Sequence, residues 1–155
     1  MDIKIIFYDF DGVMTDNRAL FSEDGKESVF VNRSDGLAIS YFKKMNIKQI
    51  IISSESNSVV TKRAEKLKIK SFQGIENKLD TIKSLIKKNK VQLSEVFFIG
   101  NDLNDLEVIN FLPNSFCPKD SNKRVLDSSA IVLNKKGGNG VIMAFYEYLM
   151  ENYLG

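Results

Sequence analysis

Short apolar runs that stop at polar residues alternate with helical segments along the whole chain, and this alternation constrains the fold more than any other feature. The clearest run covers residues 3–8, where β-branched and aromatic residues end at Asp9-Phe10-Asp11-Gly12. Runs of this composition and length indicate buried strands. Further strands are expected at residues 49–52, 71–72, 95–99, 115–117 and 130–133. Apolar spacing and capping residues predict helices from Ser34 or Asp35, at 57–67 and 76–88, and from Leu103, Ser121 and Gly140.

Strands that alternate with helices are typical of βαβ units. We therefore expect an α/β fold with a doubly wound, Rossmann-like parallel sheet, in a single domain that spans residues 1–155. Between the first strand and the first helix, two alternating pieces at 13–15 and 28–31 surround a turn signal at 22–25. This pattern predicts a β-hairpin flap over about residues 13–32.

The composition excludes several classes of protein. The chain has 22 Lys and Arg against 20 Asp and Glu, and a net charge of +2 does not favour nucleic acid as a partner. No apolar run approaches the roughly 18 residues that a membrane span needs. Cys117 is the only cysteine, which excludes an intrachain disulfide and suits the cytoplasm. With no histidine in the chain, His-based triads and His metal sites are impossible.

Polar side chains follow three of the expected strands at their carboxyl ends. Asp9 and Asp11 follow the first, Ser53 follows the second, and Asp102 and Asp105 follow the run at 95–99. Ligands bind beyond the carboxyl ends of parallel strands, and carboxylates that converge there repel one another unless a cation neutralises them. All-oxygen donors favour Mg²⁺. The alternative is that these residues are only turn and capping residues.

The segment Asp9-Phe10-Asp11-Gly12-Val13-Met14-Thr15-Asp16 resembles the D-x-D-G-V-x-T-D signature of haloacid dehalogenase-type phosphatases. Three further motifs of this family match in order: Ser53 after a hydrophobic strand, Lys78, and the acidic segment 100–105. The resemblance extends over nearly the whole chain. On residues 25–27 and 33–39 it points to the branch without a cap domain, which dephosphorylates 3-deoxy-octulosonate 8-phosphate and related nine-carbon keto-acid phosphates.

The resemblance implies a role for each matching residue. Asp9 would attack phosphorus and form an aspartyl-phosphate, and Asp11 would act as general acid and later activate water. Ser53 and Lys78 would stabilise the transferring phosphoryl group. Mg²⁺ would be held by Asp9, the Asp11 carbonyl and Asp102. Behind this set, Asp105 and Asn101 would orient its members, and Gly12 would turn its N–H towards the phosphate.

Three of these residues have simpler readings. In the simpler alternative, Ser53 only caps the helix at 57–67, Lys78 faces solvent on its helix, and Asn101 is a turn residue.

The second motif departs from the octulosonate pattern. Ser54 and Glu55 stand where that group usually has Gly-Arg, and Glu55, Arg63 and Lys66 have the spacing of a sub-branch that acts on nonulosonate 9-phosphates. Arg63 and Lys66 share one helix face and would bind a sugar carboxylate or pair with Glu55. The implied substrate-binding residues are therefore Gly12, Ser54, Glu55, Arg63 and Lys66, with a plain surface cluster as the alternative for the last three.

The family closes its open site by forming tetramers around the hairpin, so a homotetramer is implied. The apolar hairpin residues (Val13, Met14, Leu20, Phe21, Val29, Phe30 and Val31) would be hard to bury in one small domain. The glycine-rich turn at 137–140 matches the family, but Met143 replaces the expected Arg, which weakens the case for substrate contact by a neighbour's tail.

Two other functions are alternatives to a sugar-acid phosphatase. The same unit occurs as a non-catalytic oligomerisation or regulatory module in the C-terminal part of acylneuraminate cytidylyltransferases, and 155 residues leave no room for the transferase, so a free-standing unit is expected. A phospho-accepting receiver domain needs an Asp after its third strand, and its order of acids does not match this chain.

Overall fold

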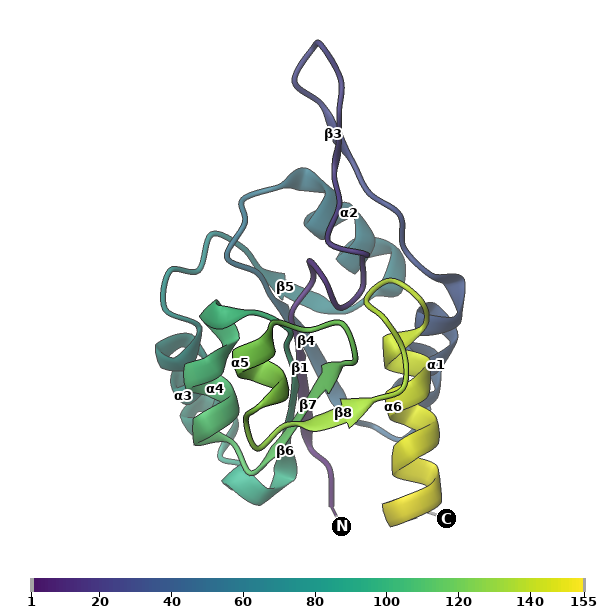
Figure 1. The fold of residues 1–155 in the computed structure, drawn as a ribbon. Coiled ribbons are helices and arrows are strands. Elements are labelled where there is room, and N and C mark those ends of the chain that lie inside the picture. The colour runs from purple at the N-terminus through teal and green to yellow at the C-terminus, as the bar shows by residue number, and fades with distance from the viewer. Residues whose placement is uncertain (1, 155) are drawn as a thin grey trace.

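A computed structural model describes residues 2–154. Six parallel strands form the central sheet in the order β5-β4-β1-β6-β7-β8 (Figure 1). The strands are β1 (Ile5–Tyr8), β4 (Lys48–Ile52), β5 (Lys70–Phe72), β6 (Val96–Ile99), β7 (Asn114–Pro118) and β8 (Ile131–Leu133). The expected doubly wound parallel sheet is confirmed.

Strand β1 lies in the middle of the sheet and pairs with β4 on one side and β6 on the other. All four residues of β1 are buried, as are all four of β6, because helices cover both faces of the sheet at this point. Continuous apolar runs are typical of strands in this position. The carboxyl ends of β1, β4 and β6 therefore meet at one edge, which is where Asp9, Ser53 and Asn101 follow them.

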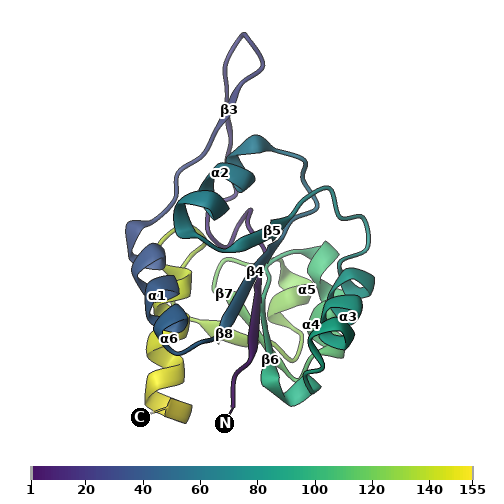
Figure 2. The same ribbon diagram turned by 180° about the vertical axis from the view of Figure 1, so that it is seen from behind.

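The helices form two layers, one on each face of the sheet (Figure 2). Helices α1, α2 and α6 pack on one face around Phe42 and Phe145, whose rings lie 5.7 Å apart. Helices α3, α4 and α5 cover the other face around Phe98. The helices are α1 (Arg33–Lys44), α2 (Ser58–Leu67), α3 (Lys78–Asn89), α4 (Leu106–Phe111), α5 (Lys123–Leu126) and α6 (Val141–Leu149). Short helical turns are η1 (Leu93–Glu95), η2 (Leu103–Asp105) and the π-helical η3 (Met150–Leu154).

Asparagine side chains fix where four of these helices begin. Asn32, Asn57, Asn77 and Asn122 each accept a hydrogen bond from a backbone N–H in the first turn of α1, α2, α3 and α5. Such caps satisfy amides that have no partner within the helix. Capping by Asn77 explains why the helix expected from residue 76 begins at Lys78.

The hairpin after β1 differs from the expected one in its bounds. Its paired strands are β2 (Leu20–Phe21) and β3 (Glu27–Ser28), with one further bridge between Thr15 and Val31. The predicted strand piece at 13–15 is wrong for residues 13 and 14, because the amides of residues 13, 14 and 15 all donate to the Phe10 carbonyl and close a tight turn. Thr15 does pair with Val31, as the hairpin prediction requires.

The hairpin projects away from the body of the molecule at the end where the strands finish (Figures 1 and 2). The hairpin leaves three apolar residues in solvent: Leu20 and Phe21 are each 70% exposed and Phe30 is 80% exposed. Val13 and Met14 are buried inside the chain's own core, so the expectation that they need a partner is wrong. Within the described residues, no helix combines the length and the apolar character that a membrane span requires.

Candidate active site

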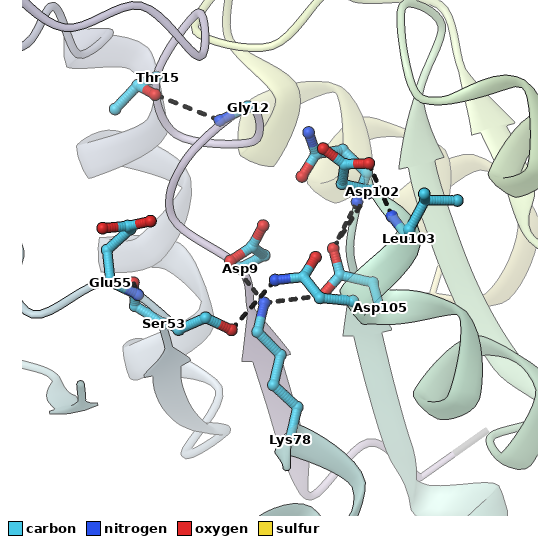
Figure 3. A network of polar contacts seen from close by, with 12 residues as sticks. Asp9, Gly12, Thr15, Ser53, Glu55, Lys78, Asp102, Leu103 and Asp105 are labelled. Carbon is cyan, nitrogen blue, oxygen red and sulfur yellow. Dashed lines mark hydrogen bonds and ion pairs between the residues drawn. The ribbon is translucent and has the colours of Figure 1, made fainter. Parts of the chain in front are cut away.

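A buried lysine joins two carboxylates at the centre of the strand-end edge (Figure 3). Lys78 Nζ donates to Asp9 Oδ1 at 2.8 Å and to Asp105 Oδ1 at 2.7 Å. Asp9 follows β1, Lys78 is the first residue of α3, and Asp105 ends η2. All three side chains are less than one-tenth exposed. The solvent-facing reading of Lys78 is therefore wrong.

This cluster shifts the pKa of its members in ways that follow from its burial. Burial first, and then the charge of Asp105, raise the pKa of Asp9 above its usual range, although Lys78 opposes this. Burial lowers the pKa of Lys78, but the attraction of Asp9 and Asp105 outweighs it, so the net pKa is raised. Lys78 is therefore a permanent positive charge beside Asp9. A further cation at Asp9 would favour its ionised form.

The side chain of Asn101 meets Asp9 from the other side. Its amide end lies 2.8 Å from Asp9 Oδ2 and 2.9 Å from the Asp11 carbonyl oxygen. With the nitrogen in this place, the amide donates to both atoms. With the oxygen there, three oxygen atoms with no proton between them face one another, which is the donor set that Mg²⁺ prefers.

This arrangement bears on the predicted metal site. Among residues 2–154, no three acidic side chains are close enough to hold a metal ion together. A cation at Asp9 would thus rely on the Asp11 carbonyl and the Asn101 amide oxygen, and these donors fit a hard cation. Asp102 lies beside them at the pocket, where its Oδ1 accepts from Leu103 N at 2.7 Å. Of the two neighbours, Asn101 therefore turns its side chain towards Asp9, whereas the role of Asp102 as a metal ligand stays a prediction.

A small pocket of about 130 Å³ opens onto Asp9. Asp11 stands at this pocket, and burial first, then the charges of Glu55 and Glu27, raise its pKa. A carboxyl group with a raised pKa suits a general acid. Asn104 Nδ2 donates to Ser54 Oγ at 3.0 Å and joins two loops at the rim. The pocket is lined by Asp9, Asp11, Asn17, Ser53, Ser54, Glu55, Asp102 and Asn104.

The buried hydroxyl of Ser53 lies at this pocket, next to the cluster, as Figure 3 shows. Its Oγ also accepts from Glu55 N at 3.2 Å, whereas α2 is capped by Asn57, so the reading of Ser53 as a helix cap alone is wrong. Asp105 supports the loop of the fourth motif, because its Oδ2 accepts from the N–H groups of Asn101 and Asp102. Asn17 and Asn104 were missed by the sequence analysis, although both lie within the matched motifs or next to them.

Gly12 does not lie as expected. Its N–H donates to Thr15 Oγ1 at 3.2 Å instead of facing the pocket. The residue has a φ of +82°, and a Cβ there would come within 2.0 Å of Asn101 Nδ2. Glycine is therefore needed for the turn and for the close approach of Asn101 rather than for a phosphate contact.

Arg63 and Lys66 lie apart from Glu55. They line a basic groove of about 460 Å³ beside α1 and α2, and Arg63 Nη2 donates to the Asn32 carbonyl at 3.2 Å. Within the described residues, neither makes an ion pair with Glu55. Among the described residues, the predicted pairing of Arg63 and Lys66 with Glu55 is therefore wrong within a single chain, because this face of α2 packs towards α1. Their predicted contact with a sugar carboxylate stays a prediction.

The chain is similar in sequence and fold to known proteins. A family model described as haloacid dehalogenase-like hydrolase matches residues 40–145. The chain is 27% identical to the 3-deoxy-D-manno-octulosonate 8-phosphate phosphatase of Salmonella typhi, over 96% of this chain and 80% of that protein. It is 22% identical to N-acylneuraminate cytidylyltransferase A of Danio rerio, over 96% of this chain. This chain spans only 35% of the length of that relative.

Several solved structures share both fold and sequence with the chain, and one of them holds ligands. It is the 3-deoxy-D-manno-octulosonate 8-phosphate phosphatase of Moraxella catarrhalis, in complex with a magnesium ion, a phosphate ion and a KDO molecule. The TM-score is 0.91 at 29% identity, and the match covers 96% of this chain and 86% of that one.

Proposed function

The chain belongs to the haloacid dehalogenase-like hydrolase family, and we propose that it is a Mg²⁺-dependent phosphatase of a keto-deoxy sugar acid phosphate. The observation that carries this proposal is the buried contact of Lys78 with both Asp9 and Asp105, beside a pocket that also holds Asp11. A lysine that neutralises a carboxylate at a pocket floor suits the binding of a phosphate dianion next to a nucleophile.

The reaction follows from the side chains. Asp9 attacks phosphorus and forms an aspartyl-phosphate, so one difficult step is divided into two. Asp11, at the mouth of the pocket, gives its proton to the leaving alkoxide and then takes one from the attacking water. Ser53 donates to a phosphoryl oxygen, and Lys78 balances the charge that spreads over the equatorial oxygens.

Asp9, the Asp11 carbonyl and the Asn101 amide oxygen would hold Mg²⁺, with Asp102 beside them. When bound there, the ion would neutralise charge on the carboxylate and the phosphoryl group. The magnesium and phosphate ions in the Moraxella catarrhalis structure support this choice of metal.

For the substrate, we favour a nonulosonate 9-phosphate over 3-deoxy-octulosonate 8-phosphate, in the biosynthesis of surface-polysaccharide sugars. Glu55 at the pocket is the reason, because it stands where the octulosonate group usually has Arg, and its carboxylate would accept hydrogen bonds from hydroxyl or amide groups of the longer sugar. The name of the cytidylyltransferase relative refers to an N-acylneuraminate, whereas the names of the phosphatase relatives refer to the octulosonate.

We also propose a homotetramer built around the hairpin. Leu20 and Phe30 border an apolar pocket of about 410 Å³, and Phe21 is a further exposed apolar residue of the hairpin. Exposed apolar patches of this kind mark interaction sites. The other partner that we propose is the small-molecule sugar phosphate itself. We place the enzyme in the cytoplasm and propose neither nucleic acid nor a membrane as a partner.

The test is phosphate release with Mg²⁺ from 3-deoxy-octulosonate 8-phosphate and nonulosonate 9-phosphates, measured side by side. Preference for the nine-carbon compounds is expected, and a Glu55→Arg variant should shift it towards the eight-carbon one. Asp9→Asn serves as the inactive control. Preference for the eight-carbon substrate would contradict the choice of sugar but not the reaction.

The second candidate is a non-catalytic module of the same fold. It is favoured by the match to a segment of a much longer cytidylyltransferase. Folded protein that turns over none of the sugar phosphates with Mg²⁺ would support this function and refute the phosphatase.

A further inference from the structure

Asp35 is a buried carboxylate that the proposed reaction does not use. It lies in the first turn of α1 and is 1% exposed. Its Oδ1 accepts from the N–H groups of Ile142, at 2.9 Å, and Met143, at 3.3 Å. These amides open α6, whose own capping position is Gly140 and has no side chain to bind them. Asp35 therefore caps a helix that lies more than 100 residues further along the chain.

The segment before α6 packs on the turn that carries Asp11. Gly138 N donates to the Val13 carbonyl at 3.1 Å. A Cβ at Gly137 would come within 2.2 Å of the Gly12 carbonyl oxygen, so backbone lies directly on backbone. Figure 1 shows this loop, which leads into α6, beside the turn after β1. Two glycines just before α6 thus contact the turn at the edge of the active site.

The surroundings of Asp35 are unfavourable for a carboxylate, so packing alone does not explain its presence. Its Oδ2 is buried and accepts no hydrogen bond in the described structure. Burial raises the pKa of Asp35 to about 6, although the two amides and the nearby Arg63 oppose this. The other titratable group that faces it is Tyr8 on β1, whose pKa is raised by burial first and then by Asp35. Tyr8 directly precedes Asp9.

We propose that Asp35 is a positioning residue for the active site: by holding the start of α6, it fixes the Gly137-Gly138 segment against the turn that carries Asp11. This inference rests on the proposed phosphatase function. Loss of this contact removes no residue from the pocket, but it lets the turn that carries Asp11 shift. A shift of about 1 Å caused by a residue remote from the chemistry can lower the rate about 100-fold.

The test compares Asp35→Ala, which loses the acceptor, with Asp35→Asn, which keeps an oxygen for the two amides. Leu149→Ala is the matched control, because Leu149 is a fully buried residue at the far end of α6. Two quantities are measured: kcat and KM for the best sugar phosphate, and hydrogen exchange at the amides of residues 13–15, which donate to the Phe10 carbonyl.

We expect Asp35→Ala to lower kcat by about tenfold or more, with a much smaller change in KM, and to speed exchange at residues 13–15. Asp35→Asn should recover most of both losses, and Leu149→Ala should lose stability without either effect. If the alanine variant does not fold, Asp35→Ser keeps a shorter acceptor and should show the same losses in part.

Two results would overturn the proposal. One is an Asp35→Ala protein with wild-type kcat and wild-type exchange at residues 13–15. The other is an asparagine variant as impaired as the alanine variant, which would show that the hydrogen bonds to α6 are not responsible. The exchange measurement needs no turnover, so it tests this inference even if the wild-type protein hydrolyses no sugar phosphate.

Discussion

Replacing Lys78 by methionine should destabilise the protein most strongly at neutral and higher pH. The side chain keeps much of its length but loses the charge that contacts Asp9 and Asp105. At an effective dielectric constant of about 20, two unit charges about 5 Å apart repel by about 3 kcal/mol. The two accepting oxygens are in this range, because each lies within 2.8 Å of the same Nζ atom.

We therefore expect Lys78→Met to lower the free energy of unfolding at pH 7.5 by about 3 to 5 kcal/mol, the usual cost of breaking a buried ion pair. The loss should shrink at pH 5. Without the lysine, which opposes the effect of burial, the folded-state pKa of Asp9 rises further, so Asp9 is protonated more readily in the folded than in the unfolded chain. Stability is then regained as the pH falls through the raised pKa towards the ordinary value.

Urea unfolding at pH 7.5 and pH 5 measures both quantities. Lys87→Met, on the exposed face of the same helix, is the control and should change stability by no more than about 0.5 kcal/mol. The double variant Lys78→Met/Asp105→Asn should recover part of the loss, because it leaves one buried charge instead of two. A Lys78→Met variant as stable as wild type at pH 7.5 would refute this reasoning. So would a loss in free energy of unfolding that is the same at both pH values.

Four other predictions follow from the site and its surroundings. Asp9→Asn should abolish phosphate release while circular dichroism and thermal unfolding stay native-like; wild-type turnover would disprove the nucleophile. Asn101→Ala should raise the Mg²⁺ concentration for half-maximal activity by about tenfold, as loss of one ligand contact would, and an unchanged Mg²⁺ dependence would speak against the amide as a ligand. Phe21→Ser with Phe30→Ser should reduce the molar mass seen by light scattering, and an unchanged mass would exclude the hairpin as the interface. Because burial raises the pKa of Asp35 from 3.8 to about 6, its ionisation should weaken the fold by about 3 kcal/mol as the pH rises from 4 to above 6; this part of the pH dependence should be missing in urea unfolding of Asp35→Asn, and its persistence would contradict the assignment.

Residues at strand ends could be predicted well from the sequence. A parallel sheet brings the carboxyl ends of its central strands to one edge whatever the details of the loops, so Asp9, Ser53 and Asp105 are found near one another as expected. The role of Lys78 in the site could be predicted from its motif alone, since nothing in the pattern of helix α3 distinguishes it from the other lysines.

The remaining differences arise where position depends on the direction of a loop or a neighbour. Spacing along α2 puts Arg63 and Lys66 on one face but does not say which element that face meets, and it meets α1. Asn101 and Asp102 are adjacent, and only the path of the loop after β6 decides which side chain turns towards Asp9. The Gly12 amide is likewise directed by a left-handed turn that closes on Thr15.

The position of β1 in the middle of the sheet has a consequence for synthesis on the ribosome. The first strand to emerge pairs with β4 and with β6, and Val96 of β6 follows Ile5 by about 90 residues. Such distant pairing makes folding slow to begin, since long loops must close before either contact forms. Asp9 gains its lysine only when α3 has emerged and its second carboxylate neighbour only after Asp105. A nascent chain therefore carries Asp9 without its partners until residue 105 has emerged, and the apolar residues of β1 lack the strand β6 over the same interval.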